Sequence, residues 1–174
     1  MAQPMKWLRL SLQAIGALSL LLFLAAAALI VHGLASGENI TPTRKDVLFV
    51  LNWSGISTDQ DFKVLAGYRS SRSLTGDHFD FYCIQLSRFE VAEFAKTQWH
   101  DGPETNPLLV DALELGANEA RRHSDCFPSP REANSAAMKM MFCSVTLHDR
   151  EPNGAEIILY DLGKKRLYYV GYKN

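Results

Sequence analysis

The clearest pattern along the chain is an uncharged apolar run of 22 residues, Leu10 to Val31. A helix rises about 1.5 Å per residue, so this run would span roughly 33 Å, close to the ~30 Å hydrocarbon core of a bilayer. Lys6 and Arg9 precede the run, and the first 35 residues contain no acidic side chain. Because flanking positive charge stays on the cytoplasmic side, the pattern predicts a cytoplasmic amino end and a body outside the cytoplasm.

This segment has three interpretations: an uncleaved membrane anchor, a cleaved signal peptide, or a buried helix of a soluble protein. Its length favours an uncleaved signal anchor, since a cleaved signal needs an apolar region of only about 7–15 residues. Gly33-Leu34-Ala35 offers a small-x-small cleavage site, and cleavage after Ala35 would give a secreted protein. A buried helix of a soluble protein is disfavoured, because no other part of the chain could cover so wide an apolar surface.

The favoured interpretation divides the chain into four parts. We expect a single-pass protein of the cell inner membrane whose lipid contact is the run Leu10 to Val31, with its body in the periplasm. The four parts are a cytoplasmic amino terminus (1–9), a transmembrane signal anchor (10–32), a tether (33–45) and an extracytoplasmic domain (46–174).

Within the domain, short apolar runs bounded by polar residues predict strands. The predicted strands are Asp46–Trp53, His78–Leu86, Met138–His148, Ala155–Leu162 and Arg166–Tyr172. The last three follow one another closely, through a turn at Glu151–Gly154 and a connection at Gly163–Lys165, so they predict an antiparallel meander.

Capping signals predict two to three helices between the early strands and this meander. Thr58 with Asp61 would begin a short helix that Gly67 ends, and the S-x-x-E box Ser87–Glu90 would begin a second helix through Ala95. Asn106-Pro107 would begin a third helix, which Arg121, Arg122 and His123 close. About five antiparallel strands packed with these helices make an α+β domain.

Charge and ligand spacing exclude two classes of function. Of the 18 Lys and Arg residues, two precede the apolar run, so 16 face 19 Asp and Glu in the body. A net charge near −3 argues against nucleic-acid binding, which needs a basic face. The histidines lack H-x-x-x-H spacing and no C-x-x-C occurs, so we expect no metal site and no cofactor.

Three cysteines, Cys83, Cys126 and Cys143, bear on the redox state of the domain. An odd number in an oxidising compartment predicts one disulfide and one remaining thiol. A Cys83–Cys143 or a Cys126–Cys143 bridge is favoured, and the alternative is that all three are small buried apolar residues.

Two polar pairs are weak candidates for catalysis. His78 and Asp80 would point to the same face of a strand, where a carboxylate could orient an imidazole as a general base. His100 and Asp101 follow Trp99 in a segment that could form a binding loop. The simpler interpretation of each is structural: polar residues near solvent for the first, and a turn with Trp99 packed into the core for the second.

Tyrosines gather in the terminal strands, at Tyr160, Tyr168, Tyr169 and Tyr172. Tyrosine offers a large contact area at a small entropic cost, so these residues are candidates for a recognition surface, together with Trp99 and His100. Ordinary filling of the strands is the alternative.

These features favour a protein-binding or accessory domain held at the membrane, with another envelope protein as its partner. An immunity or inhibitor protein and a subunit of an envelope complex both fit this class. The alternatives are a small hydrolase that uses His78/Asp80 or His100/Asp101, and a module that binds a small ligand or lipid. We lean against an enzyme, because no catalytic motif such as G-x-S-x-G occurs.

Overall fold

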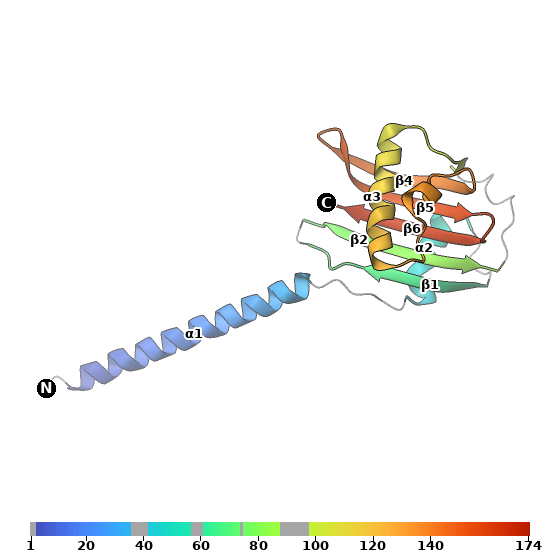
Figure 1. Ribbon diagram of the computed structural model, residues 1–174. Coiled ribbons are helices and arrows are strands. Elements are labelled where there is room, and N and C mark those ends of the chain that lie inside the picture. The colour runs from blue at the N-terminus through green and yellow to red at the C-terminus, as the bar shows by residue number, and fades with distance from the viewer. Residues whose placement is uncertain (1–2, 36–41, 57–60, 74, 88–97) are drawn as a thin grey trace. The chain divides into compact units, whose positions relative to one another are not determined.

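The computed structural model describes residues 3–35, 42–56, 61–73, 75–87 and 98–174 (Figure 1). The chain forms two units, Met1–Ser36 and Gly37–Asn174.

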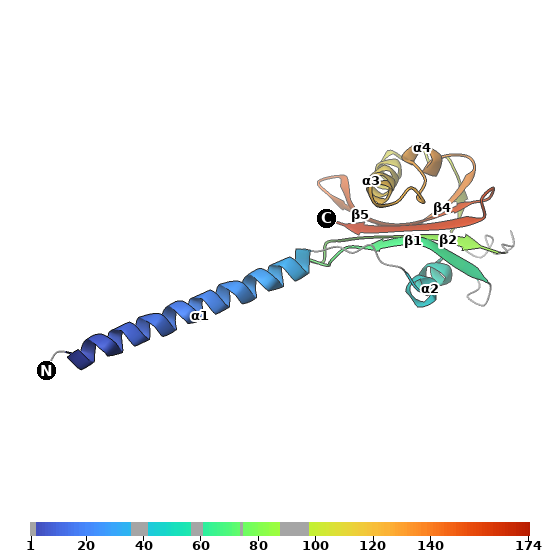
Figure 2. The same cartoon turned by 60° about the horizontal axis from the view of Figure 1, so that its bottom comes forward.

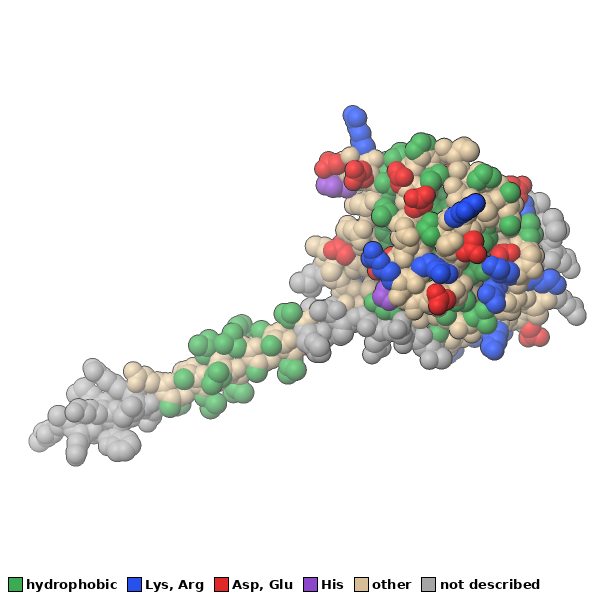
Figure 3. Space-filling model, in the orientation of Figure 1, with side chains coloured by type: hydrophobic (Ala, Val, Ile, Leu, Met, Phe, Trp, Pro, Cys, Tyr) green, Lys and Arg blue, Asp and Glu red, His purple; other side chains and the backbone are tan. Residues whose placement is uncertain are grey.

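The first unit is a single helix, α1 (Gln3–Ala35). Its segment Leu12–Val31 has a mean hydropathy of 2.7. Hydrophobic side chains surround the described part of this helix (Figure 3), and Leu29 is 73% exposed. A helix this long and apolar all round can cross a bilayer, and a signal sequence has the same features. The expected amino-terminal apolar helix is confirmed at this level.

The second unit is an antiparallel sheet with helices on both faces, so the predicted α+β layout is confirmed (Figure 2). In the described residues the sheet has six strands in the order β1-β2-β6-β5-β4-β3. Their bounds are β1 Phe62–Arg69, β2 His78–Leu86, β3 His100–Asp101, β4 Met138–His148, β5 Glu151–Asp161 and β6 Arg166–Lys173. Strands β4, β5 and β6 pair consecutively, which confirms the predicted meander.

One face of the sheet is covered by α3 (Pro107–His123) and the short α4 (Pro130–Ala133) (Figure 2). Helix α3 begins as predicted, because Asn106 Oδ1 accepts a hydrogen bond of 3.1 Å from the Leu108 N–H. At Gly116 the helix approaches β6 so closely that a Cβ atom would lie 3.1 Å from a Val170 methyl group. The core on this face includes Phe81, Leu113, Phe127, Tyr168 and Val170.

The opposite face is partly covered by α2 (Arg44–Trp53), where the sequence predicted a strand over Asp46–Trp53. That prediction is wrong. Val47, Val50 and Leu51 are fully buried at helical spacing against Ile84, Ile158 and Leu167. Asp46 Oδ2 accepts hydrogen bonds from the Thr43 backbone N–H (2.8 Å) and hydroxyl (2.7 Å), which fixes the first turn.

Strand β1 lies where the sequence predicted a helix from Thr58 that Gly67 ends. Phe62 and Val64 are half-buried and alternate with exposed Lys63 and Leu65, which is the period of a strand. Thr58 itself, and the helix predicted from Ser87 through Ala95, lie outside the described residues.

The turn predicted at Glu151–Gly154 is wrong in position. These residues begin β5, and the chain reverses at Asp149 and Arg150, whose φ angles are 49° and 71°. Asp149 and Arg150 therefore adopt the left-handed backbone conformation of the turn, although the sequence predicts that conformation at Asn153-Gly154.

Candidate functional site

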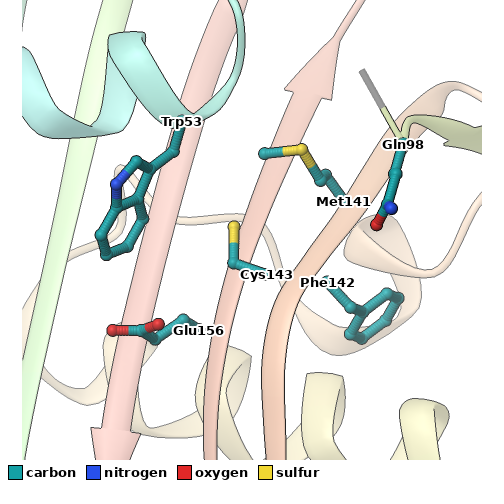
Figure 4. A pocket seen from close by; sticks show the side chains of 6 residues that line it. All are labelled: Trp53, Gln98, Met141, Phe142, Cys143 and Glu156. Atoms are coloured by element: carbon teal, nitrogen blue, oxygen red, sulfur yellow. The ribbon is translucent and has the colours of Figure 1, made fainter.

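Two adjoining hollows open on the sheet face that carries α2. The larger, about 410 Å³, is lined by Trp53, Gln98, Met141, Phe142, Cys143 and Glu156. The smaller, about 310 Å³, is lined by Phe49, Trp53, Arg69, Arg72, His78, Asp80, Tyr82, Glu156 and Tyr169. Trp53 and Glu156 line both, so we call the pair of hollows the Trp53 groove. In Figure 4, Trp53 comes from α2, and Cys143 and Glu156 come from the neighbouring strands β4 and β5.

A row of register partners crosses the sheet beneath this groove. Its members, from β1 to β4, are Arg69, Asp80, Gly171, Glu156 and Ser144. Partners directly across neighbouring strands share a face, so the floor of the groove carries a cation, a carboxylate, a glycine and a second carboxylate in sequence. The Ser144 hydroxyl donates a 3.0 Å hydrogen bond to Glu156 Oε2, which orients that carboxylate.

The aromatic wall of the groove is built from Phe49, Trp53, Tyr82 and Tyr169. The Phe49 ring meets those of Trp53 and Tyr169 edge-on, at centroid distances of 5.0 and 5.1 Å. Tyr82 and Tyr169 stack at 5.9 Å. Because Trp53 is the outermost member and is 44% exposed, it presents apolar surface to solvent between the two hollows.

The Tyr169 phenol adds a polar group to this wall. Burial raises its pKa far above the ordinary value of 10, and the nearby Glu156 and Asp80 carboxylates raise it further. The phenol therefore keeps its proton at physiological pH and can donate a hydrogen bond.

Both arginines of the groove form hydrogen bonds or ion pairs with neighbouring side chains. Arg69 donates a 2.8 Å hydrogen bond to Tyr82 Oη and lies 3.6 Å from Asp46 Oδ1. Arg72 donates a 3.1 Å bond to Asp80 Oδ2, and its own side chain is 58% exposed while that of Asp80 is 9% exposed. Burial raises the pKa of Asp80, and the Arg72 charge opposes that rise.

The first candidate pair, His78 and Asp80, lies on one face of β2 as expected, and both residues line the groove. They are not joined as an imidazole–carboxylate pair in the described structure. His78 Nδ1 lies 2.9 Å from the Gly76 carbonyl, and the Asp80 carboxylate binds Arg72. General-base catalysis by this pair would need the carboxylate to orient the imidazole, and here the Gly76 carbonyl contacts the His78 ring instead.

The second candidate pair, His100 and Asp101, occupies β3 and serves the packing of that strand. His100 Nε2 lies 2.9 Å from Glu104 Oε2, and its ring stacks on Phe142 at 5.7 Å. Asp101 forms a 2.6 Å ion pair with Lys139 on β4. The two side chains therefore have separate partners and hold β3 in place.

The aromatic binding candidates are mostly interior. Trp99 is half-buried and donates a 3.1 Å hydrogen bond to the Ser54 carbonyl at the end of α2. Tyr160, Tyr168 and Tyr172 are at most 6% exposed and fill the two cores. Of the four tyrosines, only Tyr169 lines the groove.

The cysteines lie on different faces of the sheet. Cys83 is fully buried beneath α3, Cys126 packs against the same cluster, and Cys143 lines the groove on the other face. Neither favoured bridge is formed, and both would join thiols that the sheet separates. Desolvation within the groove and the nearby Glu156 carboxylate raise the pKa of the exposed Cys143 to about 11, so its thiol is a weak nucleophile at neutral pH.

The sequence did not single out Trp53 or Glu156, the two residues that both hollows share. A signal for Glu156 exists, because it is a lone acid in the apolar run Ala155 to Tyr160. Among the residues that the structure describes, no three His, Cys, Asp or Glu side chains gather as metal ligands do.

Comparison with models of known protein families, with curated proteins and with solved structures finds no match for this chain.

Proposed function

We propose that this chain is a membrane-anchored, extracytoplasmic protein-binding domain, and that the Trp53 groove receives a segment of an envelope protein. The observation that carries the proposal is the exposure of Trp53 between two hollows. Tryptophan at the centre of a surface depression is typical of residues that dominate binding energy at protein interfaces.

The composition of the groove supports a protein segment as its occupant. Protein interfaces join an apolar, aromatic centre to a polar rim and are enriched in Trp, Tyr and Arg. Here the centre is Trp53 with Tyr169, and the rim carries Arg72, His78 and Glu156. Because the rim holds charges of both signs, the partner segment would combine apolar side chains with hydrogen-bond donors and acceptors.

Helix α1 supplies the location in this proposal. Lys6 and Arg9 before the apolar run favour a cytoplasmic amino end, and the length of the run favours an uncleaved anchor. Retention at the membrane would hold the domain near its partner and raise the effective concentration of the groove.

Site-specific photo-crosslinking in intact cells tests the proposal. A photoreactive amino acid at Cys143, inside the groove, should give one defined adduct with an envelope protein. Trp53→Ala in the same chain should remove most of that adduct, because it deletes the central apolar contact.

The matched control is Leu115, which is 48% exposed but lies on α3, across the sheet from the groove. A photoreactive residue at 115 should give no such adduct, and Leu115→Ala should leave the adduct at 143 unchanged. No adduct at 143, or one that survives Trp53→Ala, would contradict binding at the groove. A reporter that works only in the cytoplasm can be fused to the carboxy terminus. Activity of this reporter would contradict an extracytoplasmic location of the domain.

A further inference from the structure

We propose that Cys83 and Cys126 form an intramolecular disulfide under oxidising conditions, which fixes the connection between α3 and α4 to strand β2. This inference is independent of the groove and its partner.

Cys83 and Cys126 both belong to the core beneath α3. Cys83 lies in the middle of β2, between Ala66 of β1 and Tyr168 of β6, and is 0% exposed. Cys126 packs against the same hydrophobic cluster, and the ring of its neighbour Phe127 lies 5.5 Å, centroid to centroid, from that of Tyr168, which is the register partner of Cys83. Positions 83 and 126 therefore lie in one part of the core, where a local adjustment can bring the two sulfur atoms to bonding distance.

The backbone around Cys126 holds its thiol in this position. The Cys126 N–H donates a 3.2 Å hydrogen bond to Ser124 Oγ, directly after the end of α3. The next residue, Phe127, is fully buried in the cluster. The connection is therefore anchored on both sides of the cysteine.

The third cysteine cannot compete for either partner in the folded domain. Cys143 lines the groove on the α2 face, whereas Cys83 and Cys126 belong to the core on the α3 face. The sheet separates the two sites.

The two thiols have different chemical roles. The interaction between the two thiols lowers the pKa of Cys126 and raises that of Cys83, and burial raises the pKa of Cys83 further. Cys126 is also the partly exposed member of the pair. It is therefore the thiol that an external disulfide can reach and with which it can react.

The reaction is an ordinary thiol–disulfide exchange with a small-molecule or protein disulfide as oxidant. The Cys126 thiolate attacks one sulfur of the oxidant, a mixed disulfide forms, and the other half leaves as a thiolate. Cys83 then gives up its proton and attacks the Cys126 sulfur, releasing the second half. The two cysteines lose two electrons and two protons, and the oxidant disulfide becomes two thiols.

The full chain carrying Cys143→Ser, purified in mild detergent, isolates this pair. After treatment with oxidised glutathione, both remaining thiols should resist alkylation, and the intact mass should fall by two hydrogens. Proteolysis should give one cross-linked product that contains Cys83 and Cys126. The thermal midpoint should rise by several degrees relative to the reduced chain, since the bridge restricts the unfolded state.

The control chain carries both Cys143→Ser and Cys126→Ser. Substitution at the partly exposed position 126 spares the buried Cys83, and the thermal midpoint of this chain should not respond to oxidant. Two alkylatable thiols in the folded Cys143→Ser chain after excess oxidant would overturn the proposal. A glutathione adduct that persists on Cys126 would also overturn it, because Cys83 would then be out of reach.

Discussion

The Tyr169 phenol folds back over the backbone of Gly171, two residues further along β6. A Cβ atom at position 171 would overlap Tyr169 Oη and lie 2.9 Å from the ring carbon that bears it. Gly171 pairs with Asp80 on one side and Glu156 on the other. The missing side chain is thus what lets a phenol lie between two carboxylates on the floor of the groove.

Gly171→Ala should displace the Tyr169 ring and destabilise the domain by about 1–3 kcal/mol, the usual cost of forcing extra atoms into a packed site. Urea denaturation of the two proteins measures the difference.

Tyr169→Phe provides the control for this prediction, because it removes the atom that overlaps most while keeping the ring. Gly171→Ala should cost less free energy in the Tyr169→Phe background than in the wild type. An equal cost in both backgrounds would mean that the phenol does not limit the space at 171.

Asp80→Asn should change how stability depends on pH. Burial raises the folded-state pKa of Asp80 above its ordinary value of 3.8, so the stabilisation from its protonated form is complete below 3.8. That stabilisation is lost as pH rises through the raised pKa, because the native state must then hold a buried charge. The thermal midpoint of the wild type should therefore fall relative to that of Asp80→Asn from acid to neutral pH.

Asp77→Asn is a matched control with the opposite sign. Hydrogen bonds from Thr75 and Ser73 lower the pKa of this exposed carboxyl. The stability that the ionised Asp77 contributes is present above pH 3.8 and is lost as pH falls through the lowered pKa. The thermal midpoint of the wild type should therefore rise relative to that of Asp77→Asn as pH rises. The same slope for both variants would contradict the assigned environment of Asp80.

Trp99→Phe should destabilise the domain by about 1–3 kcal/mol, because it removes the donor to the Ser54 carbonyl and leaves that acceptor without this bond. Trp53→Phe is the matched change at the exposed tryptophan and should have little effect on stability. Thermal or urea denaturation separates the two, and a larger effect at Trp53 would reverse their assigned roles.

Leu21→Lys should weaken retention in the membrane, because a lysine at the centre of a spanning helix costs about 2.5–3.5 kcal/mol on insertion scales. Leu21 lies near the middle of Leu12–Val31, and the measurement is the fraction of protein that stays with carbonate-washed membranes. Leu147→Lys, at a half-exposed position of the domain, should leave this fraction unchanged. Unaltered retention of the Leu21→Lys chain would contradict a spanning role for α1.

The sequence predicted strands β2, β4, β5 and β6 of the sheet, but it missed β1, β3 and helix α2. Strands β2, β4 and β6 have apolar runs typical of strands. Helix α3 has a cap at Asn106 and basic residues in its last turn. The run from Asp46 to Trp53 is apolar and β-branched enough to resemble a strand, although Val47, Val50 and Leu51 also fit a helix. The cap that decides for the helix, Thr43 with Asp46, begins in the polar segment whose composition predicts a tether.

The groove was beyond prediction for a different reason. Asp80 and Tyr169 were recognised as candidates, but a depression forms only because α2 covers part of one sheet face. With the segment of α2 predicted as a strand, nothing could place Trp53 above Glu156. The sequence also could not place Cys126 near β2, since Cys83 and Cys126 share a core only through the packing of the α3 end and the loop after it.

The position of β6 in the sheet sets the order in which the domain can be completed. Strand β2 pairs with β1 on one side and with β6 on the other. Strand β6 follows the other described strands in the sequence, so the ribosome synthesises it after them. A β1–β2 hairpin alone is marginal, so the early part of the chain must wait for this distant partner. The early strands of such a chain would remain without their sheet partner until synthesis is nearly complete.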